Sequence, residues 1–94
     1  MKNRIWKTET TVYLLNEIVE KHNTLIPFKD LKTNIANSIG VSRASVNMAI
    51  GNLKYILSDG NTGLSAYTSR QQEAVQLTLE KHNLSQQRLF NILD

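Results

Sequence analysis

Residues 32–51 constrain the fold of this 94-residue chain more than any other stretch, because two apolar-periodic segments meet there at residues 39–41. Gly40 suits a turn that needs a positive φ. Ser42 follows the turn and suits a helix N-cap, since its hydroxyl can accept from the backbone N–H of residue 44 or 45. Ala36 is small, as a residue must be where a second helix crosses close above it. This spacing predicts a helix-turn-helix.

Apolar residues spaced three to four apart would pack the two segments together. They are Ile35, Ile39, Val41, Val46 and Ile50, and the stripe continues through Leu53 and Leu57. The second helix would run over residues 43–57, and its outer face would carry Arg43, Ala44, Asn47, Met48, Gly51 and Lys54. Gly51 inside a helix costs roughly 0.5–1 kcal/mol relative to Ala, so we expect another helix or DNA to approach the backbone there. Any two packed helices joined by a glycine turn would show a similar pattern, and this simpler interpretation stays open.

The region before this pair predicts a basic arm followed by a helix. Residues 1–8 carry three basic side chains and no acidic one: Lys2, Arg4 and Lys7. We expect Trp6 to pack on the helical core, with stacking on a base as the alternative. Thr8 could cap a helix that runs to about His22, and Asn23 could be its left-handed C-cap.

A connector over residues 24–28 precedes Asp30, which could cap the first helix of the pair over about residues 31–38. The tetrapeptide Glu-Lys-His-Asn at residues 20–23 recurs at residues 80–83, and both copies fall at predicted helix ends. We interpret them as two similar helix terminations rather than a duplication, because the flanking residues do not extend the match.

Residues 58–63 are the strongest loop signal in the chain. Residues 55–57 and 64–67 could pair around them as a short hairpin, which would add a wing to the helix-turn-helix. We favour an irregular loop over residues 58–68, because the helical stripe continues to residue 57.

Beyond the loop, residues 69–94 predict two C-terminal helices. Ser69 begins a capping box of the form S-x-x-Q and opens a helix to about His82. Ser85 could cap a last short helix. Its apolar residues need a cover, either from the domain's own core or from a second subunit in a homodimer: Leu89, Phe90, Ile92 and Leu93. The sequence thus predicts one compact all-α domain of four to five helices over residues 1–94.

Charge is distributed unevenly along the chain, whose formal net charge is +3. No Asp or Glu occurs between Leu31 and Ser58, so the proposed helix-turn-helix carries nothing that would repel phosphate. The chain contains no cysteine, which excludes disulfides and thiolate chemistry. No apolar run approaches the roughly 20 residues that span a bilayer, and the N-terminus lacks the apolar core of a signal peptide. We therefore expect a cytoplasmic protein that does not bind a membrane.

The residue pattern holds no recognisable catalytic or metal-binding motif. The two histidines, His22 and His82, stand sixty residues apart at predicted helix ends. No glycine-rich phosphate loop, zinc-ligand spacing or Ser/His/Asp arrangement is present. We expect no enzyme activity, no metal and no cofactor.

One stretch resembles the region upstream of the catalytic domain in many bacterial HNH endonucleases. The positions that match its pattern, in order, are Trp6, Ser45, Val46, Met48, Asn52, Leu53, Gly63, Leu64 and Ser65. The resemblance covers roughly residues 5–70 and departs from the pattern at Ala49, where a lysine is expected. It implies a DNA-binding module attached to, or borrowed from, restriction-type enzymes and mobile elements, without the nuclease.

These observations predict a small helix-turn-helix protein that binds double-stranded DNA, as a transcription regulator or recognition module from a phage or mobile element. Arg43 could contact guanine and Asn47 adenine in the major groove, with Ala44 and Met48 beside them. Phosphate contacts are expected from Ser42, Ser45, Lys32 and Lys54. The arm could follow the DNA backbone or an adjacent minor groove through Lys2, Arg4 and Lys7.

Two other interpretations stay open. The same scaffold could be a protein-interaction module, an inhibitor or adaptor, with an apolar contact surface made of Ala44, Met48, Leu89, Phe90, Ile92 and Leu93. The chain could also be a structural domain cut from a larger enzyme. Salt-dependent DNA binding would favour the first function, and salt-insensitive binding of a protein would favour the second.

Overall fold

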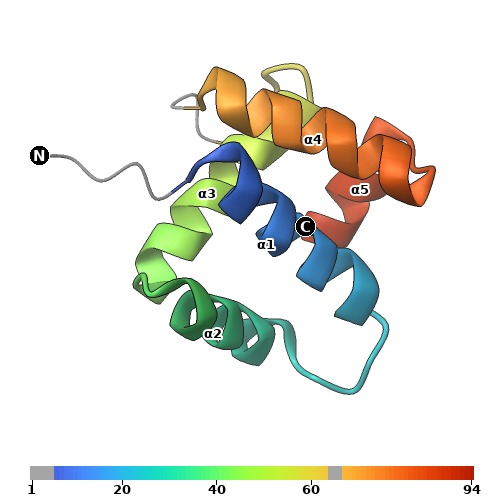
Figure 1. Ribbon diagram of the computed structural model, residues 1–94. Coiled ribbons are helices and arrows are strands. Elements are labelled where there is room, and N and C mark those ends of the chain that lie inside the picture. Colours follow the sequence, from blue (N-terminus) through green and yellow to red (C-terminus); the bar gives the residue numbers. More distant parts are fainter. Residues whose placement is uncertain (1–5, 64–66) are drawn as a thin grey trace, which may run out of the picture.

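The structure is a computed structural model that describes residues 6–63 and 67–94. The described residues form five helices, α1 (Thr8–Lys21), α2 (Phe28–Ile39), α3 (Arg43–Leu57), α4 (Ser69–His82) and α5 (Gln86–Leu93), and no strand (Figure 1). The predicted all-α fold is confirmed. In Figure 1, α4 lies along α1 on one side of the molecule and α2 packs on α3 on the other.

A single core joins all five helices. Its largest fully buried apolar side chains come from α1, α2, α3 and α5: Leu14, Leu15, Ile18, Leu31, Ile35, Val46, Leu53, Leu89 and Leu93. Each such side chain stabilises the fold by about 1.5–3 kcal/mol relative to an exposed one. Leu89 and Leu93 are therefore covered by the chain's own core, and Phe90 and Ile92 pack against its edge.

Within the described ranges, no helix is both long and apolar enough to cross a lipid bilayer.

The turn between α2 and α3 has the predicted geometry. Gly40 is left-handed with φ +88°, and its N–H and that of Val41 both donate to the carbonyl oxygen of Ala36, at 2.8 and 3.0 Å. Ser42 caps α3 by accepting from the N–H of Ser45 at 3.1 Å. Ala36 is buried, as expected for the position that the second helix crosses. This turn fixes the direction in which α3 leaves α2.

Three predicted helix starts are wrong by one to three residues, because a neighbouring residue satisfies the first turn better. Lys7, not Thr8, precedes α1, and its N–H donates to Oγ1 of Thr10 at 2.9 Å. Pro27, not Asp30, precedes α2, because its fixed φ and its carbonyl group start the helix at once. Asp30 lies inside the first turn of α2.

The third wrong start is that of α4. Its cap is Thr68, one residue before the predicted Ser69. The reciprocal hydrogen bonds of the capping box join Thr68 and Gln71, at 3.1 and 3.2 Å. The buried Gln71 decides this register, because its side chain needs a partner and finds it in the backbone of Thr68.

The irregular loop after α3 is confirmed for residues 58–63, and the first strand of the alternative hairpin is wrong because residues 55–57 belong to α3. Residues 64–66, most of its second strand, lie outside the described residues. The loop also approaches the backbone of α3 at Gly51. A Cβ atom on Gly63 would collide with the carbonyl oxygen of Gly51 and lie 2.8 Å from the backbone N of Tyr55. The group that approaches Gly51 is thus the chain's own loop.

Candidate nucleic-acid interface

The first half of α3, residues 43–48, exposes one face of the helix. The side chains of Arg43, Ala44, Asn47 and Met48 are exposed, and Met48 is 58% exposed. The opposite face is buried in the core through Val46, Ala49 and Ile50. Residues four apart in a helix are neighbours on its surface, so Arg43 and Asn47 lie one above the other. The predicted reading residues are therefore brought together.

Ser42 and Ser45 lie beside this exposed face. The side chain of each serine is held by one hydrogen bond. Ser42 is the N-cap of α3. The Oγ of Ser45 accepts a hydrogen bond from Nε1 of Trp6 at 3.0 Å. Trp6 is partly buried against the core, which confirms the expectation that it packs there. Through this contact the N-terminal part of the chain reaches α3.

The predicted basic arm is only partly described. Lys7 is exposed at the start of α1, directly after Trp6. Lys2 and Arg4 lie outside the described residues. Of the three predicted arm cations, the structure describes Lys7, which follows the Trp6 residue that contacts α3.

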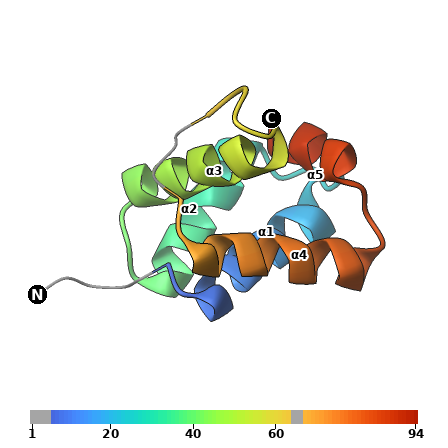
Figure 2. The same ribbon diagram turned by 90° about the horizontal axis from the view of Figure 1, so that it is seen from above.

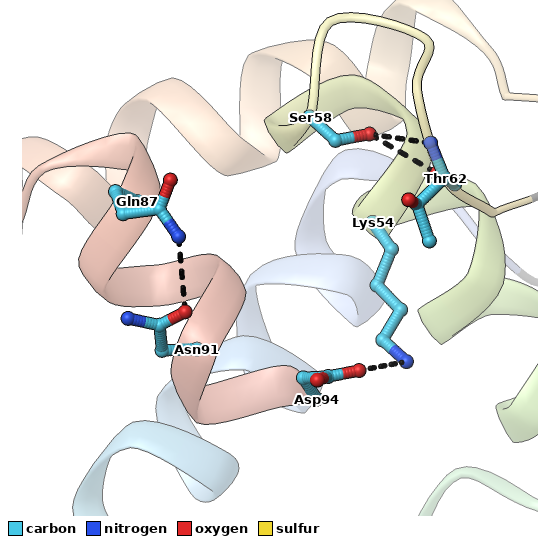
Figure 3. A network of polar contacts seen from close by, with 6 residues as sticks. All are labelled: Lys54, Ser58, Thr62, Gln87, Asn91 and Asp94. Atoms are coloured by element: carbon cyan, nitrogen blue, oxygen red, sulfur yellow. Dashed lines mark hydrogen bonds and ion pairs between the residues drawn. The ribbon is translucent and has the colours of Figure 1, made fainter.

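The two other lysines predicted to contact phosphate each have a partner within the chain. Nζ of Lys32 lies 4.9 Å from the ring centroid of Phe28, a cation–π contact. Nζ of Lys54 lies 3.0 Å from Oδ1 of Asp94, and the Lys54 side chain is 23% exposed (Figure 3). At 1.5 Å per residue, Lys54 sits about 16 Å along α3 from Arg43. A phosphate near Lys54 would have to compete with Asp94.

The start of α1 and the segment from α2 to α3 differ in charge. The segment from α2 to the end of α3 carries no acid after Asp30. Glu9 is exposed at the start of α1, where it lines an apolar hollow of about 400 Å³ with Tyr13 and Ile39. A phosphate backbone would be repelled by Glu9 and attracted by Arg43 and Lys7. The exposed face of α3 therefore carries the cation Arg43 and no acidic side chain of its own.

Within residues 6–63 and 67–94, no three His, Cys, Asp or Glu side chains gather as a metal site. Both histidines make local contacts instead. His22 donates from Nδ1 to the carbonyl oxygen of Val19 at 2.7 Å, and Nε2 of His82 lies 2.8 Å from Oδ1 of Asn16. Each histidine thus has a structural partner at a helix end.

Comparison of the chain with protein-family models, curated proteins and solved structures finds no match.

Two contacts of this surface could not be found by sequence reasoning. Trp6 and Ser45 are 39 residues apart, and Lys54 and Asp94 are 40 apart. Helical periodicity and capping patterns report on residues within one or two turns, so neither pair leaves a signal in the sequence. The sequence predicted no role for Asp94, although Asp94 pairs with Lys54, one of the residues expected to contact phosphate.

Proposed function

We propose that this chain is a small DNA-binding helix-turn-helix protein whose α3 enters the major groove. The observation that carries the proposal is the exposed, acid-free first half of α3, where Arg43 and Asn47 lie one turn apart on a helix anchored by its opposite face. The major groove is about 12 Å wide and admits an α-helix. Recognition helices of this kind contact bases with the residues of their N-terminal half.

The exposed side chains suit base contacts of different kinds. Arg43 would donate two hydrogen bonds to O6 and N7 of guanine, and Asn47 would pair with N6 and N7 of adenine. Ala44 and Met48, on the same face, would contact thymine methyl groups. Together these residues would define the sequence preference.

The polar residues around this face would hold the DNA backbone. Ser42 and Ser45 are candidates for this role, and Lys7 is a candidate cation of the arm. Lys32 and Lys54 would add phosphate contacts, the second in competition with Asp94. Lys2 and Arg4 would extend the arm. This reading suits a cytoplasmic transcription regulator, or a recognition module of a phage or mobile element as the resemblance to HNH endonucleases implies.

The deciding experiment is fluorescence anisotropy of a labelled random 30-mer duplex titrated with this chain at about 50 and 200 mM salt. If roughly 3–5 phosphates are neutralised, affinity falls by about 40- to 500-fold across this range. No binding at the lower salt concentration would refute the proposal.

A second candidate, a protein-interaction module, is favoured by one observation: Met48 is 58% exposed beside the exposed Ala44. The C-terminal helix contributes less than expected to such a surface or to a homodimer, because Leu89 and Leu93 are buried. Met48→Lys separates the two functions. On a random duplex it should strengthen binding, because it adds a cation, whereas it should disrupt an apolar protein contact.

A further inference from the structure

Trp6 links the start of the chain to the exposed half of α3. Its indole N–H donates to Oγ of Ser45 at 3.0 Å, and its ring packs against the core. Lys7, the next residue, accepts the first backbone hydrogen bond of α1 from Thr11 at 3.0 Å. The contact therefore connects the N-terminus of α1 to the surface that we propose to bind DNA.

The hydroxyl of Ser45 differs from other hydroxyls in these helices. Those of Thr33 and Thr78 donate to the carbonyl oxygen four residues earlier in their own helix, at 3.0 and 2.8 Å. The Oγ of Ser45 instead accepts from Trp6, whose Nε1–H can only donate. A serine hydroxyl has one donor and two acceptor lone pairs. Since Trp6 occupies a lone pair, the O–H proton of Ser45 is left to donate to another group.

Ser45 is placed so that its hydroxyl could donate this proton to a phosphate oxygen of DNA. Ser45 is half-buried and lies between Arg43 and Asn47 in the sequence, on the shoulder of the exposed face. A helix in the major groove has the DNA backbone along its flanks, where hydroxyl groups commonly contact phosphate. The hydroxyl is therefore at the edge of the proposed interface and has a proton to give.

We propose that Trp6 is a positioning residue for DNA binding, which holds Oγ of Ser45 so that its O–H donates to a phosphate oxygen beside the groove. This inference rests on the proposed function. Trp6 acts through Ser45 and touches no base or phosphate itself. Removal of either partner should therefore remove the same contact.

The test compares Trp6→Phe, Ser45→Ala and the double variant on the labelled duplex over 50–200 mM salt. A net hydrogen bond of about 0.5–1.5 kcal/mol corresponds to a loss of roughly 2- to 12-fold in affinity for each single variant. The double variant should lose no more than the weaker-binding single variant. Because the hydroxyl is neutral and releases no counterion, the dependence of affinity on salt should stay that of the wild type.

Three controls separate this role from a structural one. Ser45→Thr keeps a hydroxyl and should restore affinity, which a loss of packing would not explain. Thr8→Val removes a hydrogen bond of the same region, from Thr8 to Oε1 of Glu73 at 3.2 Å, and should leave affinity unchanged. The emission of Trp6, the only tryptophan, should change when duplex is added to the wild type and change less in Ser45→Ala.

The outcomes distinguish this inference from the proposed function. If the wild type binds no duplex, the proposed function is wrong and this role with it. If the wild type binds and Trp6→Phe keeps full affinity, or the two single losses add in the double variant, only the positioning role is overturned. If Trp6→Phe does not fold, the role is tested by the affinity of Ser45→Ala, the affinity of Ser45→Thr and the emission change. A Ser45→Ala variant that binds the duplex as tightly as the wild type overturns the positioning role.

Discussion

The two halves of α3 share one helix and have opposite surroundings. Residues 43–48 expose a face to solvent, whereas residues 51–57 are covered by the chain itself. Gly63 packs on Gly51, and the ring of Tyr67 stacks on Tyr55 with centroids 5.7 Å apart. Figure 2 shows α5 beside the C-terminal end of α3, where the loop over residues 58–63 begins. The covered half anchors the helix, and the anchor allows the first half to remain exposed.

The largest effect should come from the core face of the covered half. Leu53 is fully buried, so Leu53→Ala should reduce the free energy of unfolding by about 2–5 kcal/mol through lost burial and a cavity. Met48→Ala, in the exposed half, should change it by less than about 0.5 kcal/mol. Urea unfolding followed by circular dichroism measures both. Equal losses would mean that the two halves are packed alike.

The next effect should come from the loop that covers Gly51. Gly63→Ala adds a Cβ that collides with the backbone of α3, at a residue with φ +106°, and should cost about 2–4 kcal/mol. Gly40→Ala is the matched control, because Gly40 has φ +88° and open space around the added atom. It should cost about 1–2 kcal/mol. Thermal unfolding measures both variants. A larger loss of stability in Gly40→Ala than in Gly63→Ala would contradict the close packing of the loop on α3.

The sequence could predict the features that depend on residues close together in the chain. The bounds of α3, the left-handed Gly40 and the Ser42 cap depend on residues within a turn of one another, and all three are confirmed. The contact between Gly51 and Gly63 depends on how a loop returns to a helix, so the sequence predicted an approach there without indicating that the chain's own loop makes it. Of the candidate site, the exposure of the first half of α3 was predictable.

The repeated tetrapeptide shows where local prediction ends. Asn83 is left-handed with φ 55°, as a C-cap, whereas Asn23 is not, so the cap predicted at Asn23 is wrong. The residue after each copy makes the difference. Leu84 packs against the core and donates from its N–H to Leu79 at 2.9 Å, the hydrophobic contact that accompanies a left-handed cap. Thr24 is polar, and its hydroxyl instead donates to the last carbonyl of α1, at 2.7 Å.

The exposed half should affect DNA binding without affecting stability. If Arg43 reads a base, Arg43→Ala should weaken binding to the preferred sequence by about 1–3 kcal/mol and to random DNA by little. Arg70→Ala is the matched control, because Arg70 is an exposed arginine near the start of α4 and its loss changes the net charge equally. Sequence selection followed by anisotropy measures both. A loss from Arg43→Ala that is the same on every duplex would assign Arg43 to phosphate instead.

The smallest effect should come from the one cation of the covered half. Asp94→Asn removes the partner of Lys54, and because Asp94 is largely exposed the free energy of unfolding should fall by only about 0–1 kcal/mol. The freed ammonium group would be available to phosphate, so affinity for a duplex at 50 mM salt should rise, by up to about fivefold. Asp59→Asn makes the same change of charge in the loop, at an exposed residue whose left-handed φ of 54° Asn tolerates. If both variants raise the affinity for DNA equally, the increase comes from the change in net charge alone. Lys54 would then make no phosphate contact of its own.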